Sequence, residues 1–327
     1  MKKIFFIASI ALIASCGTPE VPPHTDSTSV TPKIARVKGP VFNADSAYAN
    51  IKTQVDFGPR VPDTKAHSQC SDYFIKKLKG YGLSVIPQIT SGTTAIDKRL
   101  VTITNIFAQY HPERKERILL LAHWDTRAFA DQDPDSVLAK KTFDGADDGA
   151  SGAAVLLEIA RALQQKDPNI GVDLLFADAE DGGLDHGDGA TWCIGTQYWA
   201  QHPPKDYSAR FGILLDMVGG RGAIFPREGT GVYFAPNVVE KVWSAAAGLG
   251  YGSIFTNDIT GQTTDDHLYV NQYARIPCID IVHYNPQLNG YPEWHHRHTD
   301  NMEIIEASTL RMVGEVLVDV IYNEIPK

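Results

Sequence analysis

The feature that most constrains the fold is a series of short, continuously apolar runs that alternate with helix-like segments. Arg117 to Ala122 contains the run Ile118-Leu119-Leu120-Leu121, and Val172 to Ala177 is a second run of this kind. Continuous apolar runs of this length are typical of strands that are covered on both faces. Because strands alternate with helices, we expect an α/β fold with a mixed, mainly parallel central sheet flanked by helices.

The spacing of apolar residues and the Gly and Pro breaks predict the other elements. We expect helices over residues 46–55, 64–78, 153–163, 191–201 and 238–247, a last helix with an apolar stripe between 313 and 321, and further strands over 84–89, 100–109, 211–215 and 276–282. No break in composition follows residue 40, so residues 41–327 are predicted to form one domain.

The N-terminal segment does not belong to this fold. Lys2 and Lys3 precede the apolar run Ile4 to Ile13, and small residues lead to Cys16. This order resembles a bacterial lipoprotein signal, and the run is too short to span a bilayer as a permanent helix. We expect residues 1–15 to be a signal peptide and 16–40 a tether, with the protein exported, lipid-anchored at Cys16 and periplasm-facing. An ordinary cleaved signal is the alternative.

Charge and cysteine content exclude several classes of function. The net charge is −9, and it becomes −11 once the two leader lysines are removed, which argues against nucleic acid or anionic membrane surfaces as partners. Beyond Cys16 the chain holds Cys70, Cys193 and Cys278, without CxxC spacing. This excludes a disulfide scaffold and a thiolate zinc cluster, and it leaves open one disulfide between two of the three.

A run of small residues with two adjacent carboxylates, Asp147 and Asp148, leads into the helix predicted from residue 153. Carboxylates crowded at the start of a helix require a cation nearby. The alternative is a simple turn with a helix cap, for which Asp and Gly are common.

His and acidic residues also follow the predicted strands. His123 and Asp125 come directly after one strand, Glu180 and Asp181 after the next, and Asp216 closes a third. Ligands of such sheets bind at the carboxyl ends of the strands, so we expect these side chains to converge. His, Asp and Glu without Cys are typical of catalytic zinc. In an adjacent pair such as Glu180 and Asp181, one carboxylate can bind metal while the other transfers protons.

Five motifs occur in a fixed order: Ala122-His123-Trp124-Asp125-Thr126-Arg127, Gly145-Ala146-Asp147-Asp148-Gly149-Ala150-Ser151-Gly152, Asp178-Ala179-Glu180-Asp181, Leu215-Asp216-Met217 and His296-x-x-x-Asp300-Asn301. Together they resemble the zinc exopeptidase superfamily, which contains the di-zinc aminopeptidases and the glutaminyl-peptide cyclotransferases, or glutaminyl cyclases. The resemblance covers about residues 45–325 and implies a zinc-aminopeptidase-like fold.

The segment Thr264-Asp265-Asp266-His267 indicates the branch. Aminopeptidases tend to have Ser-Asp-His there, whereas cyclases have Asp-Asp-His. The resemblance therefore implies a zinc-dependent glutaminyl cyclase, which converts N-terminal Gln of peptides and proteins to pyroglutamate and releases ammonia. We expect a monomer. The alternatives are a di-zinc aminopeptidase that hydrolyses N-terminal residues and a binding lipoprotein with a vestigial site.

The same resemblance implies the site residues. One zinc ion would be held by three ligands, Asp148, Asp181 and His296, with Glu180 as the proton shuttle. Two carboxylates, Asp216 and Asp265, would hold the amide nitrogen of the intermediate, and three aromatic residues are candidate pocket walls, namely Trp192, Tyr291 and Trp294.

Three points stay open at this stage. Counting from Trp294 would select His295 as the ligand, whereas counting from Asp300 selects His296. His123 and Asp216 match the additional ligands of the two-zinc aminopeptidases. The peptide bond after Asp148 is expected to be cis.

Overall fold

The computed structural model describes residues 36–285, 288 and 290–326. The predicted signal peptide, Cys16 and most of the tether lie outside the described residues. Within the described part, no helix is long and apolar enough to cross a membrane.

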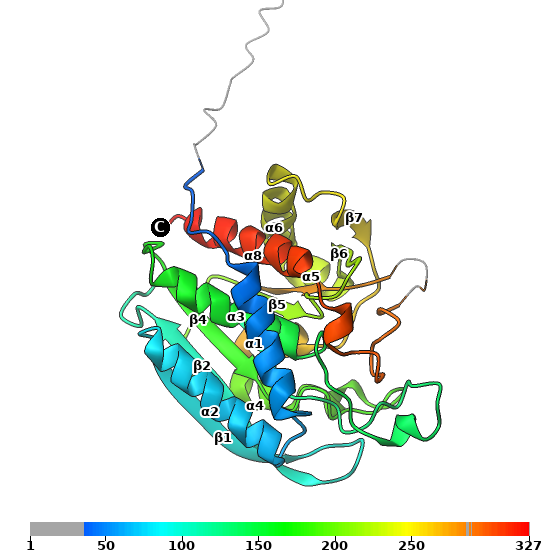
Figure 1. The fold of residues 1–327 in the computed structure, drawn as a ribbon. Helices are drawn as coiled ribbons and strands as arrows, with labels where there is room; N and C mark the ends of the chain where they lie inside the picture. Colours follow the sequence, from blue (N-terminus) through cyan, green and yellow to red (C-terminus); the bar gives the residue numbers. More distant parts are fainter. Residues whose placement is uncertain (1–35, 286–287, 289, 327) are drawn as a thin grey trace, which may run out of the picture. The chain divides into compact units, whose positions relative to one another are not determined.

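A six-stranded sheet forms the centre of the domain, in the order β1-β2-β4-β3-β5-β8 (Figure 1). The strands β4, β3, β5 and β8 are parallel, and β2 pairs antiparallel with both β1 and β4. This confirms the predicted mixed, mainly parallel sheet. The strands are β1 (Ser84–Thr93), β2 (Leu100–Tyr110), β3 (Arg117–His123), β4 (Gly171–Ala177), β5 (Gly212–Asp216) and β8 (Cys278–Val282).

The parallel strands have helices on both faces, as their continuous apolar runs predicted. In β3, Leu120 packs into the larger core together with Leu174 of β4. Their neighbours Leu121 and Leu175 point into a second, smaller core on the other face. Because side chains alternate between the two faces of a strand, only a run that is apolar at every position can serve both cores.

The larger core is covered by α1 (Ala44–Phe57), α2 (Lys65–Gly80), α3 (Ala150–Leu163), α6 (Pro236–Gly248) and α8 (Ala307–Tyr322). In Figure 1, α1 lies between α3 and α8 and packs on both. The smaller core is covered by α4 (Ile194–Gln201) and the segment η3 (Val270–Ala274), which follows α7 (Asp266–Tyr269). Three single-turn 3₁₀ helices lie in loops: η1 (Leu138–Lys140), η2 (Gly189–Thr191) and η4 (Met302–Ile304).

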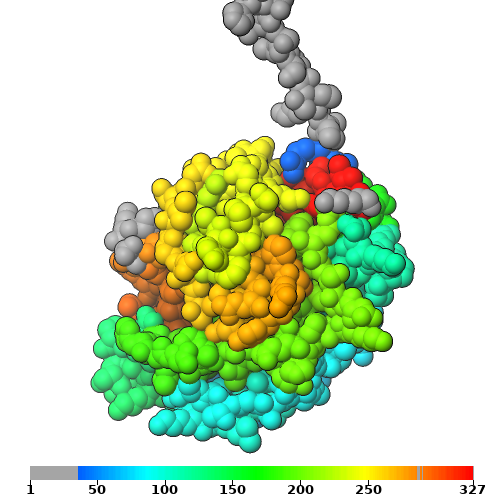
Figure 2. All heavy atoms as spheres, turned by 180° about the vertical axis from the view of Figure 1, so that it is seen from behind, coloured from blue at the N-terminus to red at the C-terminus, as the bar shows by residue number. Residues whose placement is uncertain are grey.

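Several short elements were not predicted. Besides α7, η3 and the 3₁₀ helices, they are β6 (Phe225–Arg227), α5 (Gly229–Phe234) and β7 (Phe255–Ile259). The strands β6 and β7 form a separate parallel pair. Figure 2, which looks from behind, shows the yellow and orange part of the chain, which includes these elements, as one continuous region of the surface. Cys70, Cys193 and Cys278 are all free and buried, so no disulfide joins them.

Candidate active site

The small-residue run before α3 brings two carboxylates to the carboxyl end of the sheet. Gly149 has φ +89°, and a Cβ atom there would lie 2.5 Å from the carbonyl oxygen of Asp125, so only glycine fits. The carboxylate of Asp300 accepts the backbone N–H groups of Asp147 at 2.8 Å and of Asp148 at 3.1 Å.

All peptide bonds of the described residues are trans, so the cis bond expected after Asp148 is wrong.

Asp147 supports this loop from behind. Its carboxylate accepts the N–H of Gly219 at 2.7 Å and the indole N–H of Trp294 at 2.9 Å, and burial raises its pKa to about 7. Trp294 therefore packs behind the cavity and does not line it. Its indole nitrogen is directed to Asp147, and its role as a pocket wall stays a prediction.

The three proposed zinc ligands converge although they come from three loops. His296 Nε2 lies 3.1 Å from Asp181 Oδ1 and 3.6 Å from Asp148 Oδ2, and all three side chains are buried. Asp181 Oδ2 is also buried and has no hydrogen-bond partner among the described residues. Two carboxylates and one imidazole, with an unpartnered oxygen in the group, form a donor set that fits zinc.

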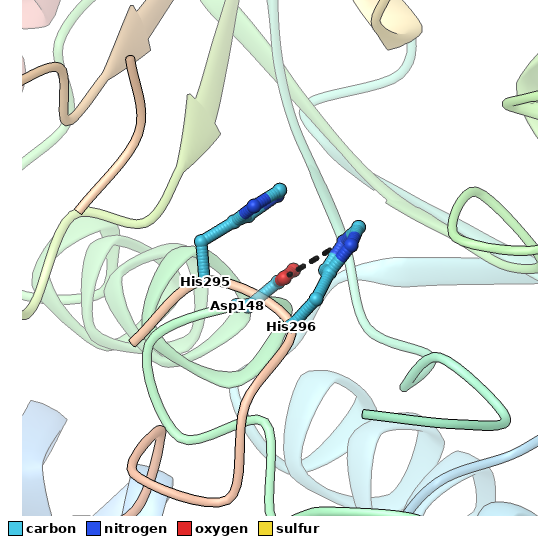
Figure 3. A group of neighbouring side chains, drawn as sticks. All are labelled: Asp148, His295 and His296. Carbon is cyan, nitrogen blue, oxygen red and sulfur yellow. Dashed lines mark ion pairs between the residues drawn. The ribbon is translucent and has the colours of Figure 1, made fainter. Parts of the chain in front are cut away.

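His295 lies beside this group, and its ring stacks on that of His296 with centroids 3.7 Å apart (Figure 3). A ring nitrogen of His295 lies within 4.8 Å of ligand atoms of Asp148 and His296. However, only His296 is within ion-pair distance of both proposed carboxylate ligands. The geometry therefore favours His296, which stays a prediction.

A second group of potential ligands shares Asp148. His123 Nε2 lies 3.1 Å from Asp148 Oδ1 and 3.2 Å from Asp216 Oδ1. Burial opposes the ionisation of Asp148, but the hydrogen bond and charge of His123 outweigh it and lower the pKa of Asp148 below its usual range. The residues that would hold a second metal ion, namely His123, Asp148 and Asp216, thus lie next to the first set of proposed zinc ligands.

Glu180 lies between the metal ligands and a further carboxyl group. Asp125 accepts the backbone N–H groups of Glu180 at 3.0 Å and of Asp181 at 3.2 Å, which fixes both residues after β4. Carboxylate or thiol atoms of Glu180, Cys193 and Asp265 lie within 4.8 Å of one another. Burial raises the pKa of Glu180 well above its usual range, which suits a group that takes up and returns a proton.

Sequence reasoning missed Asp280, which lies in the middle of β8. Its carboxyl group is within 4.8 Å of ligand atoms of Asp265 and His267, and neither of its oxygens accepts a hydrogen bond among the described residues. Burial, and then the neighbouring Asp265, raise the pKa of Asp280 well above the usual range. A protonated Asp280 can donate to Asp265. The only signal in the sequence is an acid inside an apolar strand.

Sequence reasoning also missed the part played by Arg127. Its guanidinium donates to Asp131 at 2.8 and 2.7 Å, and to the backbone carbonyl and Oδ1 of Asp181 at 3.0 and 3.3 Å. It also lies 4.9 Å from the ring centroid of Trp192, and Asp131 in turn lies 3.6 Å from His296 Nδ1. The buried guanidinium of Arg127 thus contacts the proposed zinc ligand Asp181 and the ring of Trp192. It also contacts Asp131, which lies beside the proposed ligand His296.

These side chains surround a cavity of about 310 Å³, a size that suits a small ligand. Eight of the nine predicted site residues line it, all except Trp294. The other lining residues include His295, Thr264 and the segment 184–187.

The parallel strands of this α/β fold bring carboxylates and imidazoles together around a cavity at their carboxyl ends. This arrangement is typical of metal-dependent α/β enzymes. The family model of Peptidase family M28 matches residues 105–321, and the chain belongs to this family, for which a zinc ion is implied.

Within this family, the chain is similar to several solved structures and curated sequences. Glutaminyl cyclase of Bacteroides thetaiotaomicron has a TM-score of 0.86 and 46% identity, covering 88% of this chain and 100% of that chain. Glutaminyl cyclase of Tannerella forsythia has a TM-score of 0.85 and 49% identity with the same coverage. A glutaminyl-peptide cyclotransferase of Boiga dendrophila is 23% identical over 66% of this chain, and the match spans 64% of that relative's length.

Proposed function

We propose that this protein is a glutaminyl cyclase, which converts the N-terminal Gln of peptides and proteins to pyroglutamate and releases ammonia. The observation that carries the proposal is the position of Asp265, which lines the cavity beside Glu180 and faces Asp216. Its likeness to bacterial glutaminyl cyclases over their full length supports the same function.

The cavity accepts the Gln side chain, and Asp148, Asp181 and His296 would hold one zinc ion at its inner end. When bound, zinc supplies Lewis-acid polarisation of the γ-carbonyl group. The substrate carries its own nucleophile, the α-amine, so the residues of the cavity contribute mainly orientation and electrostatics. Trp192 and Tyr291 restrict the position of the side chain.

In ring closure, a bond forms between the α-nitrogen and the γ-carbon, and the bond from the γ-carbon to the amide nitrogen breaks. Glu180 takes the proton that the α-amine loses and gives it to the departing nitrogen, which leaves as ammonia. Asp216 and Asp265 hold the amide nitrogen, and burial followed by the charge of Asp216 raises the pKa of Asp265 well above its usual range. A protonated Asp265 and an ionised Asp216 would share one proton.

A di-zinc aminopeptidase is the second candidate, because His123, Asp148 and Asp216 form an additional set of ligands. The two functions are separated by three measurements on one preparation: ammonia release from a Gln-initiated peptide, hydrolysis of a leucine anilide, and the number of zinc ions per chain. We expect ammonia, no anilide hydrolysis and one zinc. Anilide hydrolysis with two tightly bound zinc ions would overturn the proposal.

We further propose that the protein is exported as a monomer and held at a membrane by a lipid on Cys16, facing the periplasm. The support is the order of charged, apolar and small residues before Cys16 and the Pro, Ser and Thr content of the segment that follows.

A further inference from the structure

The entrance of the cavity is formed by the loop that joins Asp181 to η2. Leu184, Asp185, His186 and Gly187 line the cavity, and all four are exposed. In the proposed reaction the Gln residue fills the inner part, so the side chain of the following residue lies at this entrance.

The lining is rich in carboxyl groups. It includes six carboxyl groups, and no Lys or Arg is among the described residues that line it. Five of the six have a part in the proposed chemistry, as zinc ligands (Asp148 and Asp181), as the proton shuttle (Glu180) or as the pair that holds the amide nitrogen (Asp216 and Asp265). The sixth, Asp185, has no part in it.

Arg127 acts on Asp185 electrostatically, but among the described residues no neighbouring side chain holds the carboxylate of Asp185. Within the described parts of the chain, no hydrogen bond or ion pair involves it, and its carboxylate lies within 4.8 Å of ligand atoms of Asp131 and His296. Arg127 is the nearby guanidinium, and it already donates to Asp131 and Asp181. A cationic group of a ligand can therefore pair with the carboxylate of Asp185 at the entrance.

On the basis of the proposed cyclase function, we propose that Asp185 makes the site selective for peptides in which the residue after the N-terminal Gln is Lys or Arg. The ammonium or guanidinium group would lie against the exposed carboxylate, whereas an acidic side chain at that position would be repelled. An exposed ion pair between substrate and enzyme at the mouth of a charged cleft corresponds to a roughly threefold to tenfold difference in rate between peptides with and without the cationic side chain.

The test uses the zinc-loaded full chain and three amidated peptides, Gln-Lys-Leu, Gln-Leu-Leu and Gln-Glu-Leu. The measurement is kcat/KM for ammonia release at about pH 8, where free imidazole groups are ordinarily neutral. We expect kcat/KM to decrease from Gln-Lys-Leu to Gln-Leu-Leu to Gln-Glu-Leu, with a span of roughly threefold to tenfold between the first and the last peptide. This span should shrink in about 0.5 M NaCl because salt screens exposed charges.

Two substitutions assign the effect. Asp185→Asn should remove most of the span, and Asp185→Lys should reverse it. Asp188→Asn is the matched control, because Asp188 is exposed in the same loop but does not line the cavity, and Asn can still accept its capping bond from the N–H of Ala190. This control should keep the span.

Equal kcat/KM for the three peptides, or an unchanged span in Asp185→Asn, would overturn the selectivity proposal and leave the cyclase function standing. Release of ammonia from none of the three peptides would instead overturn the cyclase function, and the selectivity with it.

Discussion

Two of the three proposed zinc ligands, Asp148 and Asp181, are held by neighbours that are not themselves proposed ligands. Asp300 fixes the backbone of Asp148, and Asp125 fixes that of Asp181. Arg127 contacts the side chain of Asp181 directly. Such partners set the orientation of the ligands before an ion arrives, so their loss weakens metal binding.

Replacing Glu180 by Gln tests the proton transfer. The substitution keeps the size of the side chain and removes its basic oxygen, so kcat for ammonia release should fall roughly 100-fold to 10,000-fold. Zinc content should be unchanged, because Glu180 is not one of the proposed ligands. Turnover close to that of the unmodified enzyme would show that another group moves the proton.

Arg127→Lys tests the support of the metal site. Lysine keeps the charge but cannot donate to Asp131 and Asp181 together, so zinc affinity should fall roughly tenfold to 100-fold in competition with a chelating dye. Arg114→Lys is the control, since Arg114 makes a paired contact with Asp167 at 2.6 and 2.5 Å outside the cavity lining. Equal affinities of the two variants would contradict the assignment.

At the scale of elements, one buried carboxylate joins three segments. Glu228 accepts the backbone N–H groups of Thr230 and Gly231 at the start of α5 and of Thr263 in the loop before α7, and it lies 2.9 Å from His267 Nε2. Burial opposes its ionisation, but these hydrogen bonds, above all that of His267, lower the pKa of Glu228 to about 2.

Because its pKa is lower in the folded than in the unfolded state, ionised Glu228 stabilises the fold above about pH 4.5, and the contribution is lost as the pH falls toward about 2. Glu228→Gln should therefore lower the free energy of unfolding by up to about 3 kcal/mol at neutral pH, with a smaller difference in acid. Denaturant titrations at several pH values measure this.

The control for that series is Glu240→Gln, which removes an exposed carboxylate that pairs with Arg227 at the surface. Exposed pairs contribute little to stability. A loss in Glu228→Gln that does not change with pH would indicate that the size of the side chain, and not its charge, supports these segments.

The elements predicted from the sequence are those in which apolar residues repeat over several helical turns or form a continuous run. β3 and β4 were recognisable because both faces of each strand are buried. β6, α5 and β7 span only three to six residues each, so no period could appear. The proposed metal ligands lie in recognisable motifs, whereas Asp280 and Arg127 make contacts between distant segments that local spacing does not encode.

The turn between η1 and α3 was missed for a different reason. A left-handed Gly149 and a cis bond both reverse the chain within a run of small residues. The structure distinguishes them, because the peptide bond after Asp148 is trans and Gly149 has φ +89°.

At the scale of the whole molecule, Cys16→Ala tests the proposed anchor. Without the thiol no lipid can be attached, so the protein should move from the membrane fraction to the soluble fraction while ammonia release per molecule stays the same. Fractionation followed by immunoblotting measures this. A soluble unmodified protein would instead indicate an ordinary cleaved signal.

The loops that carry the metal ligands have a consequence for metal supply. Asp148 and His296 are 148 positions apart in the chain, and they meet only after β3, β4, β5 and β8 have paired. The unfolded chain thus offers no formed site, so zinc held by the proposed ligands would favour the folded state. Its binding free energy then adds to the free energy of folding and grows with the free zinc concentration. The free energy of unfolding of this protein would therefore depend on the free zinc concentration around it.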